Sequence, residues 1–482
     1  MPYINNLTSF LKGHSADENE KNLVLSMLLL CFAAPALRWR ELRKRYGGDL
    51  RRGLHDALCI LNAQGSKYSG LVYPESVWNG FDDSELSGIV GLVERLFTGE
   101  DERERPTPPE LCAFIMQDLW GCSKRQTDSY RTPRQVAKLM AELLELKEGI
   151  VYDPCCGSGN MLVYASEYTR QKKRTCRLYG QEADETAWKI ARISLILHGV
   201  EASVGDAAAS AVADAPGFPD GMKADYVLSS PPFRRYGEAL GQMFAGIQWK
   251  DGFPRADKGE FVWLQLMLSR LKEDGVIAAI FSNGILASRR REERKIRAAL
   301  LREDLVEAIF TLPGGSFYTT KVSVSLWILR KRKKETCREK ILFADARGMG
   351  SAEKGVVVLS DAEQNELIQA YRNFENGISD DRPGFCRQVP ITEIEAEEYS
   401  FAPERYVMDR RQKPLELEQL KHEEKELEHR LKELMQKNSD HITHILDIGQ
   451  ENANDRGGSI SKILPVSGQA VQESCAVADG DV

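Results

Sequence analysis

Short apolar runs alternate with stretches of helical periodicity from Tyr130 onward. Four of these runs are predicted strands that end at a polar residue: 149–152 at Asp153, 177–181 at Glu182, 202–205 at Asp206 and 224–229 at Ser230. The four polar residues follow one another at intervals of 29, 24 and 24 positions, close to the length of one strand–helix unit. This spacing predicts an α/β fold with a Rossmann-like, doubly wound parallel sheet, in which ligands bind at the carboxyl ends of the strands.

The same pattern continues toward the C-terminus, and a helical region precedes it. Apolar periodicity predicts helices at 259–271 and 292–303, and strands at 276–282, 305–312, 322–329 and 340–345. Residues 1–125 have the pattern of an N-terminal helical domain. Its most apolar run, Leu23–Leu37, is shorter than the ~20 apolar residues that span a membrane. We therefore expect a buried helix there and no membrane segment.

The C-terminal part divides into three predicted segments. Residues 348–402 are mixed and polar, which suggests a connecting region. Residues 403–437 contain Leu420, Leu427, Leu431 and Leu434, an apolar seam on a charged helix. Both a coiled-coil-like helix for subunit assembly and an ordinary surface helix fit this seam. Residues 438–482, which become rich in Gly, Ser, Asp and Ala from Gln450 onward, are predicted to form a disordered tail.

Charge and cysteine usage narrow the classes of function. The 482-residue chain carries a formal net charge of −7, which is unfavourable for a protein that must neutralise nucleic-acid phosphates alone. Either its basic residues cluster locally or a partner supplies the basic surface. The ten cysteines include no Cys-x-x-Cys pair, which argues against a zinc site and a secreted disulfide framework. We expect a cytoplasmic protein without a bound metal.

The first candidate site is the segment Asp153-Pro154-Cys155-Cys156-Gly157-Ser158-Gly159-Asn160, between a predicted strand and a predicted helix. Gly157 and Gly159 allow close approach of a ligand to the backbone, and the helix N-terminus favours a carboxylate or another polar group. Glu182 is placed to accept hydrogen bonds from a ribose diol, and Asp206 to accept from an adenine amino group. The alternative for both acids is a solvated carboxylate at a strand end.

The segment Tyr130-Arg131-Thr132-Pro133-Arg134 precedes a clean amphipathic helix. Thr132 has the character of its N-cap and Pro133 of its first residue. Two interpretations stay open. The segment is either only a well-capped helix start, or a second helix terminus that faces a cofactor.

The second candidate site lies in Ser229-Ser230-Pro231-Pro232-Phe233, directly after an apolar strand. Two prolines stiffen the backbone and remove two donors, so that its carbonyl oxygens act as acceptors. Such acceptors suit the amino group of a flat base, on which Phe233 can stack. Acceptors on both amine hydrogens would favour a tetrahedral nitrogen and free its lone pair. The alternative is a proline-stiffened loop without chemistry.

These segments, in this order, resemble the amino-methyltransferases of DNA. More narrowly, Tyr130–Met140, Leu312–Thr320 and Phe343–Arg347 resemble the modification subunit of type I restriction–modification systems, in the N-6 DNA methylase family. The resemblance implies that residues 126–347 are an S-adenosylmethionine-dependent methyltransferase domain. It also implies a cofactor site at Tyr130, Thr132, Pro133, Asp153, Gly157, Ser158, Gly159, Asn160, Glu182 and Asp206, with catalytic residues Ser230, Pro231, Pro232 and Phe233.

The resemblance further implies partners. The expected ones are double-stranded DNA, a specificity subunit, a second copy of this chain, and a restriction nuclease or translocase subunit. A separate subunit that reads the sequence would explain the acidic net charge. Arg234–Arg235, Arg289–Arg291 and Lys331–Lys334 are candidate phosphate contacts, with solvated surface runs as the alternative.

One residue departs from the family pattern. Ser230 stands where the family usually has Asn, and serine at this position is more familiar in enzymes that methylate the N4 amine of cytosine. Adenine N6 and cytosine N4 therefore both stay open as the methylated atom. Two further interpretations are an inactive scaffold that keeps the fold, and an enzyme that methylates an amine of a protein or an RNA.

Overall fold

The computed structural model describes much of the chain between residues 18 and 408, with gaps. The described residues are 4, 7–9, 18–33, 46, 49–63, 66–77, 81–98, 106–115, 119, 132–209, 211, 218–219, 221–232, 259–317, 321–353, 356–408, 424–427, 429–434 and 436. The chain divides into two compact units, Met1–Met408 and Asp409–Val482, and each is described by itself.

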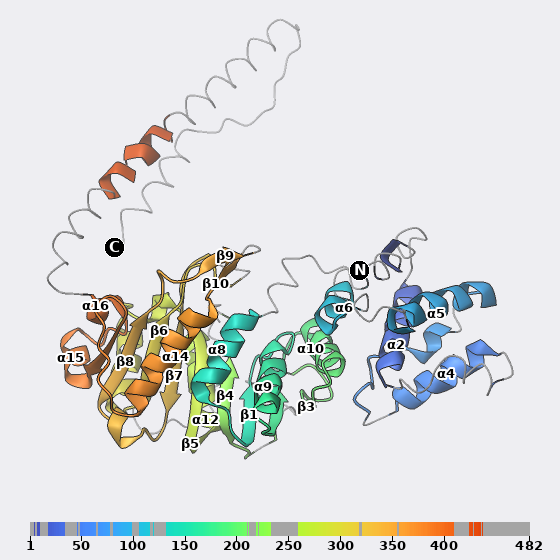
Figure 1. Ribbon diagram of the computed structural model, residues 1–482, viewed down its shortest axis with the longest axis horizontal. Helices are drawn as coiled ribbons and strands as arrows, with labels where there is room; N and C mark the ends of the chain where they lie inside the picture. Colours follow the sequence, from blue (N-terminus) through green and yellow to red (C-terminus); the bar gives the residue numbers. More distant parts are fainter. Residues whose placement is uncertain are drawn as a thin grey trace, which may run out of the picture. The chain divides into compact units, whose positions relative to one another are not determined.

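A nine-stranded sheet organises the described part of the first unit (Figure 1). Its spatial order is β11 (Cys386–Pro390), β8 (Lys340–Asp345), β6 (Val306–Thr311), β7 (Val324–Arg330), β5 (Leu271–Ser282), β4 (Ala224–Ser229), β1 (Gly149–Asp153), β2 (Cys176–Gly180) and β3 (Ala202–Ser203). The strands from β3 to β5 are parallel, whereas β7 runs antiparallel to β5 and β6. The chain reverses its direction of strand addition between β1 and β4, which makes this pair the switch point of the sheet.

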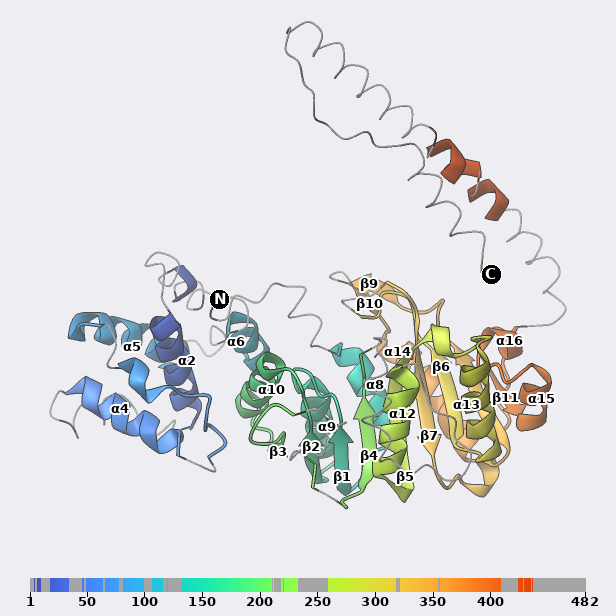
Figure 2. The same cartoon turned by 180° about the vertical axis from the view of Figure 1, so that it is seen from behind.

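Helices cover both faces of the sheet, as the doubly wound pattern predicts (Figures 1 and 2). One apolar core contains side chains of α8 (Arg134–Leu144), α9 (Asn160–Gln171), α10 (Glu185–Leu197) and α14 (Asp361–Glu375). The core on the opposite face contains side chains of α12 (Gly259–Arg270), α13 (Arg291–Arg302), α15 (Ile391–Ala396) and α16 (Glu404–Val407). Every residue of β6 and every residue of β7 except Arg330 is buried, so these two strands are mostly apolar rather than alternating.

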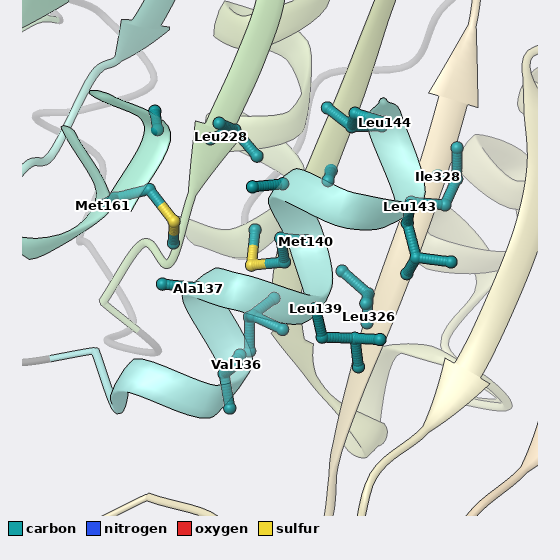
Figure 3. Packing of buried hydrophobic residues seen from close by; sticks show 14 of the residues in the cluster. Val136, Ala137, Leu139, Met140, Leu143, Leu144, Met161, Leu228, Leu326 and Ile328 are labelled. Carbon is teal, nitrogen blue, oxygen red and sulfur yellow. The ribbon is translucent and has the colours of Figure 1, made fainter. Parts of the chain in front are cut away.

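The amphipathic stripe of α8 explains how this helix packs. Its residues Val136, Leu139, Met140 and Leu143 are buried, and they lie beside Leu228, Leu326 and Ile328 of the sheet (Figure 3). The helix therefore lies over β4, β5 and β7 of the sheet and begins at residue 134. This packing leaves the segment before it, with Thr132 and Pro133, next to the loop that follows β1.

The described N-terminal elements are mainly helical, in agreement with the sequence pattern. They are α2 (Glu18–Ala33), α4 (Leu50–Leu61), η1 (Pro74–Val77), α5 (Asp83–Thr98) and α6 (Pro108–Phe114). Their apolar core also contains Ile193 and Leu197 of α10. Arg192 of α10 donates hydrogen bonds to the carbonyl oxygens of Ser69 and Lys67, both at 2.8 Å. None of the helices within the described ranges has the length and apolarity needed to cross a bilayer.

Residues 348–402 are more ordered than their polar composition suggests. They contribute α14 and β11 to the main fold, and β9 (Ser351–Glu353) pairs with β10 (Val356–Val358) beside it. β11 pairs antiparallel with β8 along five residues. The interpretation of this range as a connecting region therefore does not describe its structure, because strand pairing with β8 compensates for the weak apolar pattern of Cys386–Pro390.

In the second unit, residues 424–427, 429–434 and 436 are helical. Leu427, Leu431 and Leu434 are 67%, 59% and 55% exposed. Leu420 and the predicted tail at 438–482 lie outside the described residues.

Candidate functional site

The loop after β1, residues 153–160, leads directly into α9. Gly157 and Gly159 have φ angles of +55° and +78°, in the left-handed region that favours glycine. A Cβ atom on Gly159 would lie 3.4 Å from Cα of Ala191, so α10 packs closely behind the loop. Ser158 is buried and Asn160 is the first residue of α9. The positive end of the α9 dipole thus lies at the edge of the sheet where β1 ends.

Glu182 joins this loop to the end of β2. Its two carboxylate oxygens accept hydrogen bonds from the backbone N–H groups of Gly157 at 3.0 Å and Asp184 at 2.9 Å. Burial raises the pKa of Glu182, against the opposing effect of the N–H groups that bind its carboxylate. The N–H of Ala183 is a third backbone donor to this carboxylate. Of its about four lone pairs, one therefore remains to accept from a hydroxyl of a ligand.

Backbone hydrogen bonds connect three strand ends in this region. The N–H of Cys156 donates to the carbonyl of Gln181 at 2.9 Å, and the N–H of Gln181 donates to the carbonyl of Asp153 at 3.0 Å. The N–H of Ala209 donates to the carbonyl of Glu182 at 2.7 Å. The loop that carries the exposed Asp206 is therefore held next to the end of β2. The ends of β1, β2 and β3 form one continuous edge, as the spacing of their polar residues predicts.

The segment before α8 also reaches this edge. The side-chain amide of Asn160 donates to the carbonyl of Thr132 at 3.4 Å. The cap of α8 is Pro133, which makes no side-chain hydrogen bond, and the helix begins at Arg134. The prediction of Thr132 as N-cap is therefore wrong by one residue, because proline supplies the extended backbone that precedes the first turn. Tyr130 lies outside the described residues.

A buried side-chain network lies beneath the loop. The hydroxyl of Ser229, the last residue of β4, donates to Oδ1 of Asp153 at 2.8 Å. The N–H of Cys155 donates to the same oxygen at 3.1 Å, and the Cys155 thiol lies 3.0 Å from the Ser229 hydroxyl. Asp153 is only 2% exposed. Burial raises the pKa of Asp153 to about 7, although the hydrogen bond from Ser229 opposes this shift. Direct contact of Asp153 with a cofactor stays a prediction.

The second candidate segment begins at the next residue. Ser230 is partly buried, Pro231 is buried and Pro232 is exposed. Phe233 lies outside the described residues. Because β4 is the neighbour of β1, the structure brings the start of this segment to the same edge as residues 153–160. No group of three or more His, Cys, Asp or Glu side chains within the described ranges is arranged to hold a metal ion.

A model of the N-6 DNA methylase family matches residues 111–414, more than half of the chain. The chain belongs to the N-6 DNA methylase family. The match begins within α6 and continues beyond α16, so it includes both candidate segments and the region around α14 and β11.

Methylase subunits of type I restriction enzymes are similar in sequence to this N-6 DNA methylase. It is 29% identical over 293 residues to the HindI type I restriction enzyme methylase subunit of Haemophilus influenzae, with 59% of this chain and 64% of that protein covered. It is 26% identical over 380 residues to the MjaIX type I methylase subunit of Methanocaldococcus jannaschii, with 73% and 67% covered. The chain thus spans about two thirds of the length of these curated relatives.

A solved structure of similar fold is the type I restriction–modification methyltransferase subunit of Streptococcus thermophilus. The identity is 23%, the TM-score is 0.57, and the superposition covers 84% of this chain and 95% of that one. The mixed α/β architecture of this N-6 DNA methylase, with its large central sheet, is therefore that of known methyltransferase subunits.

Sequence reasoning gave no individual role to several residues at this N-6 DNA methylase site, although Ser229 and Cys155 lie within the two candidate segments. Ser229 and Cys155 make the buried contacts to Asp153, and Tyr152 donates a hydrogen bond to the side chain of Gln181. Tyr152 also stacks on Phe218, with ring centroids 4.2 Å apart. The only local signal for Ser229 is its place directly before Ser230. Its role depends on the pairing of β1 with β4, which no local pattern encodes.

Proposed function

We propose that this chain transfers a methyl group from S-adenosylmethionine to the N6 amine of adenine in double-stranded DNA. We further propose that it acts as the modification subunit of a type I restriction–modification complex. The observation that carries the proposal is the meeting of residues 153–160 and Ser230–Pro232 at the β1–β4 switch point of an N-6 DNA methylase. Ligands of doubly wound sheets bind at this location.

The residues at this edge fit S-adenosylmethionine. Gly157 and Gly159 present a backbone without Cβ atoms, and the N-terminus of α9 favours the carboxylate of the methionine end. The carboxylate of Glu182, which accepts from three backbone N–H groups, has a lone pair left for a ribose hydroxyl. Asp206 is exposed next to that position and can accept from the adenine amino group. When bound, the cofactor supplies an electrophilic methyl group.

In this proposal the chain contributes mainly positioning and exclusion of water. The target base leaves the duplex, and Ser230 and the carbonyl oxygens beside Pro231 and Pro232 accept from its amino hydrogens. These hydrogen bonds favour a tetrahedral nitrogen, whose lone pair then points at the methyl group. The amine proton leaves late, to solvent or through Ser230. Rate enhancement comes from holding the two reactants in line.

Cytosine N4 is the second candidate target, and Ser230 is the observation that favours it. A serine hydroxyl is a shorter acceptor than an asparagine amide, so the amine of a smaller ring would have to approach differently. The family match favours adenine. The identity of the methylated base in cellular DNA separates the two targets.

A basic surface near the same edge is a candidate phosphate contact. Arg289, Arg290 and Arg291 are exposed and follow the end of β5. Within the described residues, no ion pair includes any of the three. The turn before them is held by Arg297, which is 1% exposed and donates to the carbonyls of Ile285 at 3.1 Å and Ser288 at 2.6 Å. Because Arg297 holds this turn in place, the three arginines can contact the phosphates of a DNA backbone from a fixed position.

Sequence reading belongs, in this proposal, to a specificity subunit. The relatives from Haemophilus influenzae and Methanocaldococcus jannaschii are methylase subunits of type I enzymes. The net charge of −7 suits a chain that shares DNA binding with a partner. The exposed stripe Leu427, Leu431 and Leu434 is the candidate surface for this subunit. A second copy of the chain and a restriction subunit would complete the assembly.

The test is to co-express the full chain with a cognate specificity subunit in a host without endogenous methylation, and to map modified bases in its DNA. N6-methyladenine at a single motif is the expected result. Detection of N4-methylcytosine instead would show that cytosine N4, the second candidate, is the methylated atom. Absence of both, in a complex that still binds S-adenosylhomocysteine, would contradict the proposal and indicate a scaffold. Ser230→Ala is the matched variant, and we expect it to lower kcat at least tenfold.

A further inference from the structure

We propose that Ser229, Asp153 and Cys155 form a buried link that positions the cofactor loop and the target-base loop relative to each other, with Ser229 as its central positioning residue. The link rests on the proposed function, and it assigns to Ser229 a role that is separate from that of Ser230. Ser229 touches neither reactant in this proposal; it acts through the two loops that it joins.

The link begins where the backbone connection between the strands ends. The ladder of β1 and β4 pairs Val151 with Tyr226 and Tyr152 with Val227. Past these pairs β1 continues to Asp153 and β4 continues to Ser229, and side chains make the connection between the two strand ends. The hydroxyl of Ser229 donates to Oδ1 of Asp153 at 2.8 Å across a sequence separation of 76 residues.

A third group closes the link on the cofactor side. The N–H of Cys155 donates to the same Oδ1 of Asp153 at 3.1 Å, and its thiol lies 3.0 Å from the Ser229 hydroxyl. Ser229 is fully buried and Asp153 nearly so. Buried polar groups need their partners, so a displacement of one member requires the others to move. The three groups thus respond as a unit.

The position of the link makes such a displacement matter for chemistry. Ser229 directly precedes Ser230, the proposed acceptor for the base amine. Cys155 lies two residues before Gly157, whose N–H is held by Glu182 at 3.0 Å. A shift of the link therefore changes the acceptor and the cofactor cradle together. A misplacement of about 1 Å between reacting groups can lower a rate about 100-fold.

The groups that face Asp153 support this role. They are Ser229 from β4, Glu182 from the end of β2, Cys155 and Cys156 from its own loop, and Tyr152 from β1. Among the residues that the structure describes, none of these neighbours is a cation. The carboxylate is held by hydrogen bonds, which are directional, rather than by an ion pair. This arrangement suits a group whose function is to fix geometry.

The first test uses the full chain and two readouts. Binding of S-adenosylhomocysteine is measured by calorimetry on the chain alone, and initial rates of DNA methylation are measured in the complex with the specificity subunit. Ser229→Ala should weaken S-adenosylhomocysteine binding about tenfold, although Ser229 lies outside the cofactor loop. It should also lower kcat about tenfold at saturating S-adenosylmethionine. Ser229→Thr, which keeps the hydroxyl, should recover most of both.

The control is Thr169→Val, which removes a buried hydroxyl that donates to the carbonyl of Ala165 at 2.9 Å within α9. It should change neither readout by more than about twofold. A Ser229→Ala chain with a lower Tm but wild-type affinity and kcat would overturn the link and leave Ser229 a packing residue. If the wild-type chain neither binds S-adenosylhomocysteine nor methylates DNA, the proposed function itself fails, and the link fails with it.

A double-mutant cycle covers the case in which Ser229→Ala does not fold. Asp153→Asn keeps the size of the side chain but replaces the carboxyl group by an amide, whose single oxygen is a weaker acceptor for Ser229 and for the N–H of Cys155. We expect the same two losses from it, each smaller than in Ser229→Ala. In the Asp153→Asn background, substitution of Ser229 by Cys should cost less than in the wild type. Independent, multiplicative losses in the two backgrounds would contradict the link.

Discussion

Two buried carboxylates, in the two halves of the sheet, have opposite surroundings. Glu307 of β6 is fully buried; it accepts from Nε of Arg330 at 2.9 Å and from the hydroxyl of Tyr371. Arg330 also lies 3.6 Å from Glu375. Asp153 of β1 is almost as buried, yet none of the ion pairs within the described ranges includes it. A scaffold carboxylate is compensated by a cation, and the site carboxylate is not.

The difference has a consequence for protonation. Burial raises the pKa of Glu375, but its ion pairs with Lys334 and Arg372 outweigh this effect and lower it overall, so it stays ionised. Burial raises the pKa of Asp153 to about 7, and its hydrogen bonds only partly oppose the shift. The far half of the sheet thus has a fixed charge pattern, whereas the switch point has a carboxyl group that changes charge near neutral pH.

The largest expected effect comes from removing the compensating cation. Arg330→Met should destabilise the fold by about 3–5 kcal/mol, because it leaves Glu307 buried without the cation that compensates it. Urea unfolding gives the free energy directly. Arg332→Met is the matched control, since the Arg332–Asp274 pair is exposed, and it should cost less than about 1 kcal/mol. Equal losses in the two variants would remove the contrast between the two halves of the sheet.

The next effect concerns the pH dependence of stability. A carboxyl group whose folded pKa is raised from 3.8 to about 7 binds more protons in the folded than in the unfolded state between these values. Its contribution to stability is complete below pH 3.8 and is lost as pH rises through about 7. Asp153→Asn removes this contribution.

The difference in unfolding free energy between wild type and Asp153→Asn should therefore change by about 2 kcal/mol from pH 5.5 to pH 8, in favour of the variant at high pH. Urea unfolding of both chains across this range measures it. If this difference in unfolding free energy stays constant with pH, Asp153 is ionised across the whole range and its charge is balanced by other groups in the folded chain.

A smaller effect is expected at the basic surface. Arg290→Gln should weaken DNA binding by the complex severalfold and reduce the slope of log K against log salt by about 1, because one phosphate contact is lost. Titrations at several salt concentrations give the slope. Arg302→Gln, at the far end of α13, should leave the slope unchanged. An unaltered slope for Arg290→Gln would mean that Arg289–Arg291 is a solvated surface run that does not contact DNA phosphates.

The smallest effect on stability is expected in the second unit. Leu431→Asn should change the unfolding free energy of the chain by less than about 0.5 kcal/mol, because Leu431 is 59% exposed. It should nevertheless reduce co-purification of the specificity subunit. Glu433→Gln serves as the control on the same helical segment. Undiminished co-purification of Leu431→Asn would assign the stripe to ordinary solvent-exposed surface.

Much of the switch-point half could be predicted because its signals are local. The strand 224–229 matches β4 at both ends, and the predicted ends of the strands before Asp153 and Ser230 fall within one residue of the observed ones. Glycine, proline and apolar runs act within a few residues, so they can be interpreted without knowing the neighbours. The predicted cap before Arg134 differs by one residue from the observed one, since threonine and proline both suit a helix start.

The region after Asp345 shows where local signals fail. Only Cys386 and Val389 of β11 are buried, so the segment Cys386–Pro390 has little apolar pattern of its own. Its strand conformation depends on pairing with β8. The capping box of Ser360 and Glu363 at the start of α14 is the local signal in this region, and it marks a helix start within an otherwise polar stretch.

The sequence by itself determined the doubly wound sheet, the glycine-bearing loop after β1 and the proline-bearing segment after β4, because residue type and spacing act locally. Only the tertiary structure decided that Ser229 meets Asp153, that Asp153 lies beneath the loop rather than at its surface, and that Glu307, unlike Asp153, has a cation as partner among the described residues. Burial and partners of a side chain depend on which strands become neighbours. That choice is made by the packing of the whole sheet.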